Sequence, residues 1–184
     1  SLTQDMPKRF YYHGPMFRYE RPQKGRLRQF NQFGIEVFNQ STFFCDLEVI
    51  FLANELMKVL NISKHVRLEI NTIGNFYSRQ KYKDKLVEYL EPFVNDLSQE
   101  SKIRLKKNPL RILDSKEKAD IKILKESPKI KDFLDKASII FYDSLKEFLI
   151  KLNVDFTENL KLVRGLDYYN HSVFEFVSKE EKSQ

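Results

Sequence analysis

The sequence predicts an α+β fold in which a sheet flanked by helices is interrupted by a small helical insert. Strand-like runs rich in Phe, Tyr, Val and Ile occupy residues 8–21 and 27–38, and an alternating run follows at 66–73. Residues 75–150 then carry successive helical segments. Strand-like residues return at 154–176, so the chain is expected to leave one sheet and rejoin it.

The first two strands are expected to form a hairpin, followed by a helix and a third strand. Ser41 is a typical N-cap residue, and apolar residues recur at helical spacing after it over residues 42–60. The stretch VRLEINTI, at 66–73, alternates as a strand does. Three prolines separate the later helical segments: Pro92, Pro109 and Pro128.

The length of 184 residues suits one domain with a small insert. We expect the first part of the sheet domain at 1–74, the helical insert at 75–153 and the return to the sheet domain at 154–184. The sequence does not begin with Met, which we interpret as the sign of a fragment cut from a longer protein.

The composition narrows the class of protein. Hydrophobic residues make up 41%, enough for a real core, and the net charge of +6 favours anionic partners. The single cysteine, Cys45, excludes an internal disulfide and suits a cytoplasmic location. The histidines His13, His65 and His171 lack metal-ligand spacing, so no metal site is expected. No apolar stretch is long enough to span a membrane.

The second strand of the hairpin has two contrasting faces, because side chains alternate along a strand. One face is apolar and is expected to pack on the core: Phe33, Ile35 and Val37. The other face carries a ring, an amide, a gap and a carboxylate: Phe30, Gln32, Gly34 and Glu36. Gly34 would let a ligand lie against the backbone. A polar face that meets only water explains the same residues, so alternation alone leaves both interpretations open.

Five basic residues gather around the hairpin turn: Arg18, Arg21, Lys24, Arg26 and Arg28. If the strands keep their register, Arg18 and Glu20 share one face. A charged tip can discourage pairing between sheet edges, and it can equally contact phosphate or RNA. Local physics does not separate these two uses.

A second cluster of candidate residues lies in LVRGLDYY, at 162–169. Arg164 stands between apolar neighbours and is expected to be buried or half-buried, which requires an anionic partner such as Asp167 or a ligand. Tyr168 and Tyr169 are adjacent and point to opposite faces of a regular strand. If both serve one ligand, the chain must bulge near the glycine.

These segments resemble one enzyme family. FRYERPQKGRLRQFNQFGIEVF, at 17–38, resembles motif 2 of class II aminoacyl-tRNA synthetases, and its ERPQKGR loop resembles the histidyl-tRNA synthetase version. LVRGLDYY and the following SVFEF resemble the signature peptide of the same enzymes, and NPLRILDSK, at 108–116, resembles part of their helical insertion domain. The resemblance implies a class II antiparallel sheet flanked by helices. It also implies that histidine and ATP form histidyl-adenylate and pyrophosphate, before transfer to histidine tRNA.

The resemblance implies an ATP site at the hairpin. Arg18 would bridge the histidine carboxylate and the α-phosphate, and would act as a catalytic residue. Glu20 would face the adenine, Arg26 would face the terminal phosphates and Phe30 would stack on the adenine ring. ATP with Mg²⁺ would be a substrate complex, with no tightly bound cofactor. The loop residues Arg21 and Lys24 would approach tRNA or phosphate.

The resemblance also implies a histidine pocket. Gln32 would hold the backbone groups of the histidine, together with Arg18, and Glu36 would accept a hydrogen bond from its imidazole. Arg164, the second catalytic residue, would contact the α-phosphate from the opposite side. Tyr168 and Tyr169 would close the pocket.

Several parts of the family pattern are missing from this sequence: motif 1, the loop before motif 2, motif 3 and the anticodon-binding domain. We therefore expect the chain by itself to lack aminoacylation activity, and the full-length protein to be a cytoplasmic homodimer. Two alternatives remain. One is a synthetase-like regulatory subunit of histidine biosynthesis, which would bind histidine without charging tRNA. The other is an RNA-binding module built on the basic hairpin.

Overall fold

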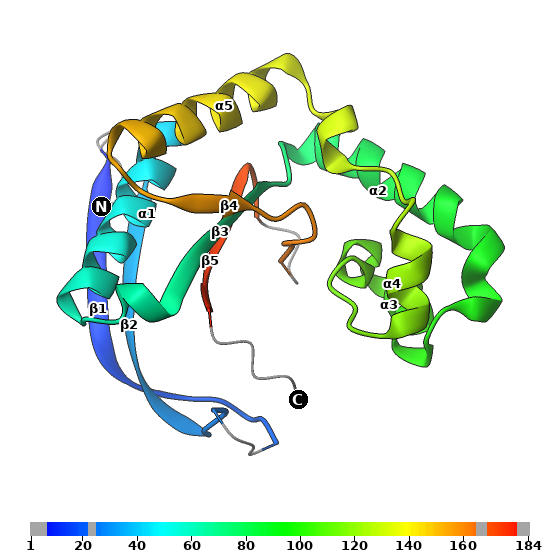
Figure 1. Ribbon diagram of the computed structural model, residues 1–184, viewed down its shortest axis with the longest axis horizontal. Helices are drawn as coiled ribbons and strands as arrows, with labels where there is room; N and C mark the ends of the chain where they lie inside the picture. Colours follow the sequence, from blue (N-terminus) through cyan, green and yellow to red (C-terminus); the bar gives the residue numbers. More distant parts are fainter. Residues whose placement is uncertain (1–6, 22–24, 165–168, 180–184) are drawn as a thin grey trace.

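The computed structural model describes residues 7–21, 25–164 and 169–179. Within these ranges the strands form two separate sheets, one of two strands and one of three. Figure 1 shows the two-stranded hairpin along one side, the second sheet in the centre and a group of helices at the far end. The α+β fold class is therefore as expected.

The hairpin consists of β1 (Lys8–Phe17) and β2 (Gln29–Phe38), which pair antiparallel along their whole length. The register places Tyr12 opposite Gly34 and Met16 opposite Phe30. Both strands confirm the sequence prediction, although regular pairing ends several residues before the turn. The register decides which side chains of β1 stand beside the polar face of β2.

The second sheet has the order β4-β3-β5, with β3 (Val66–Thr72) in the centre. β5 (Ser172–Ser178) pairs antiparallel with β3, and the short β4 (Phe156–Glu158) pairs parallel with it. β3 is the strand predicted at 66–73. A parallel partner is possible because the chain crosses the whole helical region between β3 and β4.

Two helices cover the second sheet, α1 (Phe43–Val59) and α5 (Lys136–Lys151) (Figure 1). Their apolar stripes meet β3 in one cluster of buried side chains: Leu47, Ile50, Leu68, Ile70, Tyr142, Leu145, Leu149 and Val154. Burial of this surface is the main stabilising contribution to this half of the molecule.

The start of α1 differs by one residue from the prediction. Thr42, not Ser41, is the N-cap, and its side chain makes no capping hydrogen bond to the helix backbone. Thr42 Oγ1 instead lies 3.8 Å from the Sγ of Cys45, which is buried. The helix predicted over 42–60 is otherwise confirmed.

The helical region contains α2 (Phe76–Leu90), α3 (Gln99–Lys107) and α4 (Lys118–Leu124). Short 3₁₀ turns connect or precede the elements of the chain: η1 (Ser63–His65), η2 (Glu91–Asp96), η3 (Pro109–Ile112) and η4 (Ile130–Phe133). Pro92 and Pro109 lie in the first turns of η2 and η3, where a missing backbone N–H costs nothing.

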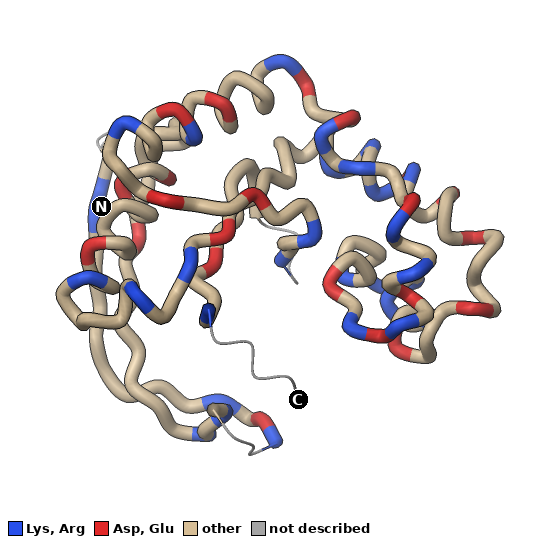
Figure 2. The backbone as a smooth tube through the Cα atoms, in the orientation of Figure 1, with Lys and Arg blue, Asp and Glu red and all other residues tan. Residues whose placement is uncertain are grey.

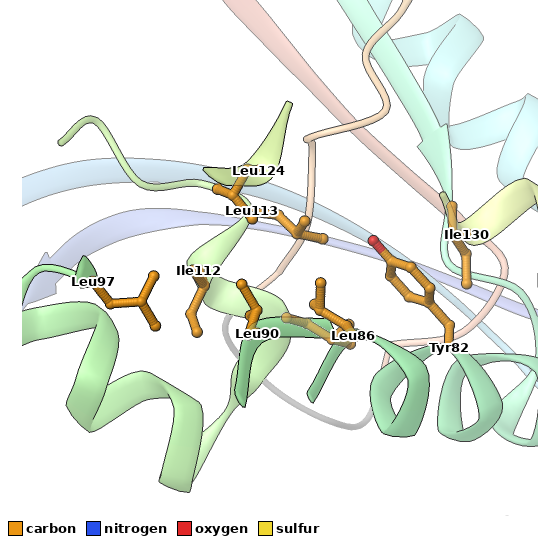
Figure 3. Packing of buried hydrophobic residues seen from close by; sticks show 9 residues of the cluster. Tyr82, Leu86, Leu90, Leu97, Ile112, Leu113, Leu124 and Ile130 are labelled. Carbon is orange, nitrogen blue, oxygen red and sulfur yellow. The ribbon is translucent and has the colours of Figure 1, made fainter. Parts of the chain in front are cut away.

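The helical region has a hydrophobic core of its own. Figure 3 shows its buried side chains reaching toward one another from α2 and the segments after it: Tyr82, Leu86, Leu90, Leu97, Ile112, Leu113, Leu124 and Ile130. Phe133 and Leu134 pack at the end of this cluster. These residues of the helical region therefore pack around a cluster of their own.

The packing of α5 does not match the expected end of the insert at residue 153. Its residues fall within 75–153, the range assigned to the insert, yet Leu145 and Leu149 are buried against α1 and β3. We therefore propose that the insert ends near Leu134 and that α5 belongs to the sheet domain. Helical periodicity alone could not reveal where α5 packs, because the apolar face of an amphipathic helix does not identify the element that it covers.

Candidate functional site

Charged side chains meet where the two strands of the hairpin stop pairing. Arg18 Nε donates a hydrogen bond of 3.0 Å to the Leu27 carbonyl oxygen, and Arg18 Nη1 lies 3.9 Å from Glu20 Oε1. Arg26 Nη1 approaches the other Glu20 oxygen at 3.6 Å. Figure 2 shows acidic and basic residues gathered at this end of the hairpin. The carboxylate of Glu20 thus lies between two guanidinium groups.

An aromatic ring completes this cluster. The guanidinium carbon of Arg18 lies 4.5 Å from the ring centroid of Phe30, a favourable cation–π distance. Within the described residues, the Oε2 atom of Glu20 is buried and accepts no hydrogen bond. A buried acceptor without a donor is costly, so the cluster offers a ring face, fixed positive charge and one unused acceptor to a ligand.

The middle of the polar face is filled by Tyr12. Its Oη accepts a hydrogen bond of 2.7 Å from Gln32 Nε2, and its ring lies against Gly34. A Cβ atom at position 34 would clash with this ring. The gap expected at Gly34 therefore holds an aromatic ring of the protein itself. Tyr12 was not among the predicted site residues, although its place opposite Gly34 follows from the hairpin register.

Glu36 lies further along the same strand, opposite Phe10, and is exposed. The other face of β2 meets α1, where Ile35 and Val37 border a pocket of about 240 Å³ together with residues of the helix. Phe33 departs from the expectation that this face is buried, because 45% of it is exposed. Phe33 nevertheless lines the same pocket as Val49 and Leu52 of α1.

Arg164 is exposed, which corrects the prediction of a buried or half-buried side chain. Its Nη2 donates a hydrogen bond of 3.2 Å to the Phe174 carbonyl oxygen in β5. The backbone of the second sheet therefore supplies the acceptor, and no buried ion pair is needed to hold this arginine. Gly165, Asp167 and Tyr168 lie outside the described residues.

Tyr169 is half-buried beside Ile73, Leu162 and Val173. Its backbone carbonyl accepts a hydrogen bond from Nη1 of Arg79, a residue of α2 that is only 8% exposed. Arg79 is not among the site residues that the sequence predicts. Its signal was weak, since one arginine in a helix rich in charged residues resembles ordinary surface.

The structure thus groups the predicted residues in two places. At the end of the hairpin, Arg18 contacts both Glu20 and Phe30, and Arg26 approaches Glu20. Gln32 and Glu36 follow Phe30 on the same face of β2. The contacts given above for Arg164 and Tyr169 are instead made with the second sheet and α2. Lys24, like Tyr168, is outside the described residues.

The part of the chain that the structure describes contains neither a metal-binding cluster nor a membrane-spanning helix. No group of three or more His, Cys, Asp or Glu side chains there is placed to hold a metal ion. No helix there has the length and apolar character needed to cross a membrane.

Comparison with known proteins gives a consistent result. A family model for histidyl-tRNA synthetase matches residues 1–184. A histidine–tRNA ligase of Gluconobacter oxydans is 47% identical over 180 residues, covering 98% of this chain and 43% of that protein. One of Streptococcus pneumoniae is 49% identical over 175 residues, covering 95% of this chain and 41% of that protein. The chain thus spans about two fifths of the length of these relatives.

Solved structures agree with these matches. The structure of apo histidyl-tRNA synthetase from S. aureus superposes with a TM-score of 0.72 at 34% identity, covering 95% of this chain and 40% of that one. An ATP phosphoribosyltransferase regulatory subunit/histidyl-tRNA synthetase from Bacillus halodurans C gives a TM-score of 0.59 at 22% identity, covering 94% and 48%. The second likeness concerns the fold alone.

Proposed function

Because this chain belongs to the histidyl-tRNA synthetase family, we propose that it contributes half of the ATP site and most of the histidine pocket of a histidine–tRNA ligase. In the first step, a carboxylate oxygen of histidine bonds to the α-phosphorus of ATP, and the bond from that phosphorus to pyrophosphate breaks. In the second step, a hydroxyl at the 3′ end of histidine tRNA attacks the acyl carbon, and AMP leaves.

The observation that carries this proposal is the cluster at the end of the hairpin. Activation needs no protein nucleophile, so the protein must place two anions together and stabilise charge on phosphate oxygens. Arg18 and Arg26 suit this task because a guanidinium stays charged and grips oxygens in a fork. Arg18 would bridge the carboxylate and the α-phosphate, and Arg26 would bind the terminal phosphates that accompany Mg²⁺.

The adenine would bind beside the same cluster. The unused Oε2 of Glu20 would accept a hydrogen bond from the exocyclic amino group of the base. Arg18 already covers one face of Phe30, so the adenine would stack on the other face. Binding would therefore satisfy an acceptor that is otherwise buried without a donor.

The histidine would extend from Arg18 along the polar face of the hairpin. Gln32 would bind its backbone groups while Tyr12 holds the amide in place, and Glu36 would accept from its imidazole. Tyr168 and Tyr169 would close the pocket. A carboxylate at this end of the face suits an imidazole, which carries an N–H donor in each protonation state.

Arg164 would act from the side opposite Arg18. One of its Nη atoms is occupied by the Phe174 carbonyl, and the exposed guanidinium retains other donors for the α-phosphate. Arg18 directly follows β1 of the hairpin, whereas Arg164 is hydrogen-bonded to β5 of the second sheet. If ATP bound between them, a guanidinium group would contact the α-phosphate from each side. Neither arginine would act as an acid or a base.

Membership of the family also suggests the tRNA partner, the assembly and the location of the full-length protein. Histidine tRNA would approach the basic hairpin end through Arg21 and Lys24, whose charge suits a phosphate backbone. The full-length protein would work as a cytoplasmic homodimer in protein biosynthesis.

The regulatory-subunit alternative is less well supported. Such a protein has no need for phosphate-facing arginines, whereas Arg18, Arg26 and Arg164 are all present. An RNA-binding module would explain the basic residues but not Gln32 and Glu36. Binding of both histidine and ATP with Mg²⁺ would exclude the second alternative, and adenylate formation would exclude the first.

The direct test is calorimetric titration of the chain with histidine and, separately, with ATP and Mg²⁺. We expect Glu36→Ala to abolish histidine binding and to leave ATP binding unchanged. Glu88→Ala, at an exposed carboxylate of α2, is the matched control and should bind both ligands as the unaltered chain does. Histidine binding that survives Glu36→Ala would contradict the assignment of the pocket.

A second test uses the full-length protein and the exchange of pyrophosphate into ATP. Arg18→Ala should slow the exchange about 100- to 1000-fold, the usual effect of losing one preorganised group that stabilises transition-state charge. An exchange rate within about twofold of the unaltered enzyme would refute the catalytic role of Arg18.

A further inference from the structure

A pocket of about 560 Å³ lies in the helical region, away from the hairpin. One wall is α4 and the loop that follows it through Pro128, and the other includes Leu160 and Lys161, which precede Arg164 in sequence. The pocket therefore lies where the insert meets the segment that leads to the signature peptide. Its volume falls in the range of small-molecule sites, roughly 300–1,000 Å³.

The floor and rim of this pocket differ in character. The apolar side chains of the lining, called the floor here, are Tyr82, Leu113, Ile121, Leu124, Pro128 and Leu160; of these, Ile121 is 41% exposed. The rim is basic: Lys118, Lys122, Lys125, Lys129 and Lys161. No Asp or Glu is among the described residues that line it.

The rim lysines have no described partner. Within the described ranges, none of the five makes an ion pair or a hydrogen bond through its side chain, whereas Lys131 nearby bonds Glu158 at 2.8 Å. Like charges around one cavity repel, and low-dielectric walls strengthen the field inside it. An anion bound at the rim would relieve that repulsion.

We propose that this pocket binds a free nucleotide: a phosphate monoester held by the lysines and a flat ring buried on the apolar floor. Both halves of the ligand are required by the lining. A polyanion alone would satisfy the lysines and leave the floor in water, and an apolar molecule alone would leave the charges unpaired. No residue of the pocket belongs to the hairpin site, so this proposal stands apart from the proposed ligase activity.

The test is a titration of the chain with AMP, followed by ¹³C-methyl NMR. Ile121 and Leu124 report on the floor of the pocket, and Leu27 and Ile35 report on the hairpin. We expect saturable shifts at the floor methyls with AMP, and weaker binding of adenosine and of ribose 5-phosphate, which each carry one half of the ligand. Shifts confined to the hairpin would overturn this proposal while leaving the proposed ligase site intact.

Charge reversal on the rim provides the second measurement. Lys122→Glu with Lys125→Glu should weaken AMP binding at the floor methyls roughly tenfold or more, because two attractive charges become repulsive. Lys106→Glu with Lys107→Glu makes the same change in net charge on α3, outside the pocket, and should leave the affinity unchanged. Circular dichroism would verify that both double variants fold.

A titration with a short single-stranded RNA distinguishes a nucleotide pocket from a surface that is only basic. Floor shifts produced by the RNA without any produced by AMP would overturn the proposal, because the charges would then serve a polymer and not a pocket-sized ligand. Equal loss of AMP binding in both double variants would overturn it as well.

Discussion

At the scale of single residues, the contact between Tyr12 and Gly34 shapes the polar face of the hairpin. The ring of Tyr12 lies where a side chain at position 34 would stand, and its hydroxyl positions the amide of Gln32. The glycine is therefore needed for an intramolecular contact. In the proposed pocket, this contact presents the amide to the amino acid.

Gly34→Ala should displace the Tyr12 ring and break its hydrogen bond to Gln32. We expect histidine binding to weaken about tenfold, the effect of losing one well-placed hydrogen bond, while the fold persists. Gly14→Ala is the matched control, because a Cβ at that position meets no atom within 4 Å. Calorimetry would measure both, and equal affinities in the two variants would refute the role of Tyr12.

Asp120 is a second residue of interest, because its surroundings set the pKa of its carboxyl group. It is fully buried in the insert and accepts hydrogen bonds from three serine hydroxyls, those of Ser98, Ser101 and Ser115, at 2.6–2.7 Å, and from the Ser98 backbone N–H at 2.9 Å. Burial alone would raise the pKa of Asp120, but these hydrogen bonds outweigh it and lower the pKa below its ordinary value of 3.8.

Asp120→Asn should destabilise the chain by about 2 kcal/mol. The three hydroxyls donate to Oδ2 and the Ser98 backbone N–H donates to Oδ1, whereas an amide has only one acceptor oxygen. The exposed Asp114 offers the control, and Asp114→Asn should change the free energy of unfolding very little. Urea unfolding measures both. Because the folded pKa is lowered, the carboxylate stabilises the fold above pH 3.8 and loses that effect as the pH falls through the lowered pKa.

At the scale of elements, α5 is the helix that joins the end of the insert to the sheet. Its N-cap, Asp135, accepts a hydrogen bond of 2.8 Å from the Ser138 backbone N–H. Tyr142, Leu145 and Leu149 then recur on one face and are buried in the sheet cluster. The helix thus closes the core over β3 after the chain returns from the insert.

Leu145→Ala should lower the free energy of unfolding by about 2–5 kcal/mol, since it removes a fully buried side chain and leaves a cavity. Leu152→Ala, at the C-cap of the same helix and 41% exposed, should cost less than about 1 kcal/mol. Chemical denaturation of the two variants provides the comparison. Similar losses at both positions would show that α5 does not belong to the sheet core.

At the scale of the whole molecule, His171, which follows LVRGLDYY in the sequence, contacts both α5 and Gly74. Its ring stacks on Phe141 of α5 with centroids 4.2 Å apart, and its backbone N–H donates to the Gly74 carbonyl at 2.8 Å. Burial lowers the pKa of His171, and the nearby Asp135 acts in the opposite direction. The folded state therefore favours the neutral imidazole.

This lowered pKa predicts a loss of stability on mild acidification. Below the ordinary histidine pKa of 6.5, the unfolded chain binds a proton that the folded chain resists, so the melting temperature should fall from pH 7.5 to 5.5. His171→Asn should flatten this dependence, since asparagine tolerates the positive φ of 52° at this position. His13→Asn, on the exposed face of β1, is the control and should retain the full slope.

The sequence by itself determined the kinds of elements and the faces of the hairpin. The strands at 8–21 and 27–38 and the helix at 42–60 were predictable because alternation, helical spacing and capping depend on residues close together in the chain. The selection of Arg18, Glu20 and Phe30 was equally local, since it rested on one contiguous motif.

Only the tertiary structure decided which distant residues meet. It placed Tyr12 over Gly34, assigned α5 to the sheet and left Arg164 exposed against Phe174. It also gathered lysines from α4 and from the segment before Arg164 around one apolar pocket. These outcomes depend on contacts across ten residues or more. A local pattern carries no information about which of several apolar or charged partners a side chain will find.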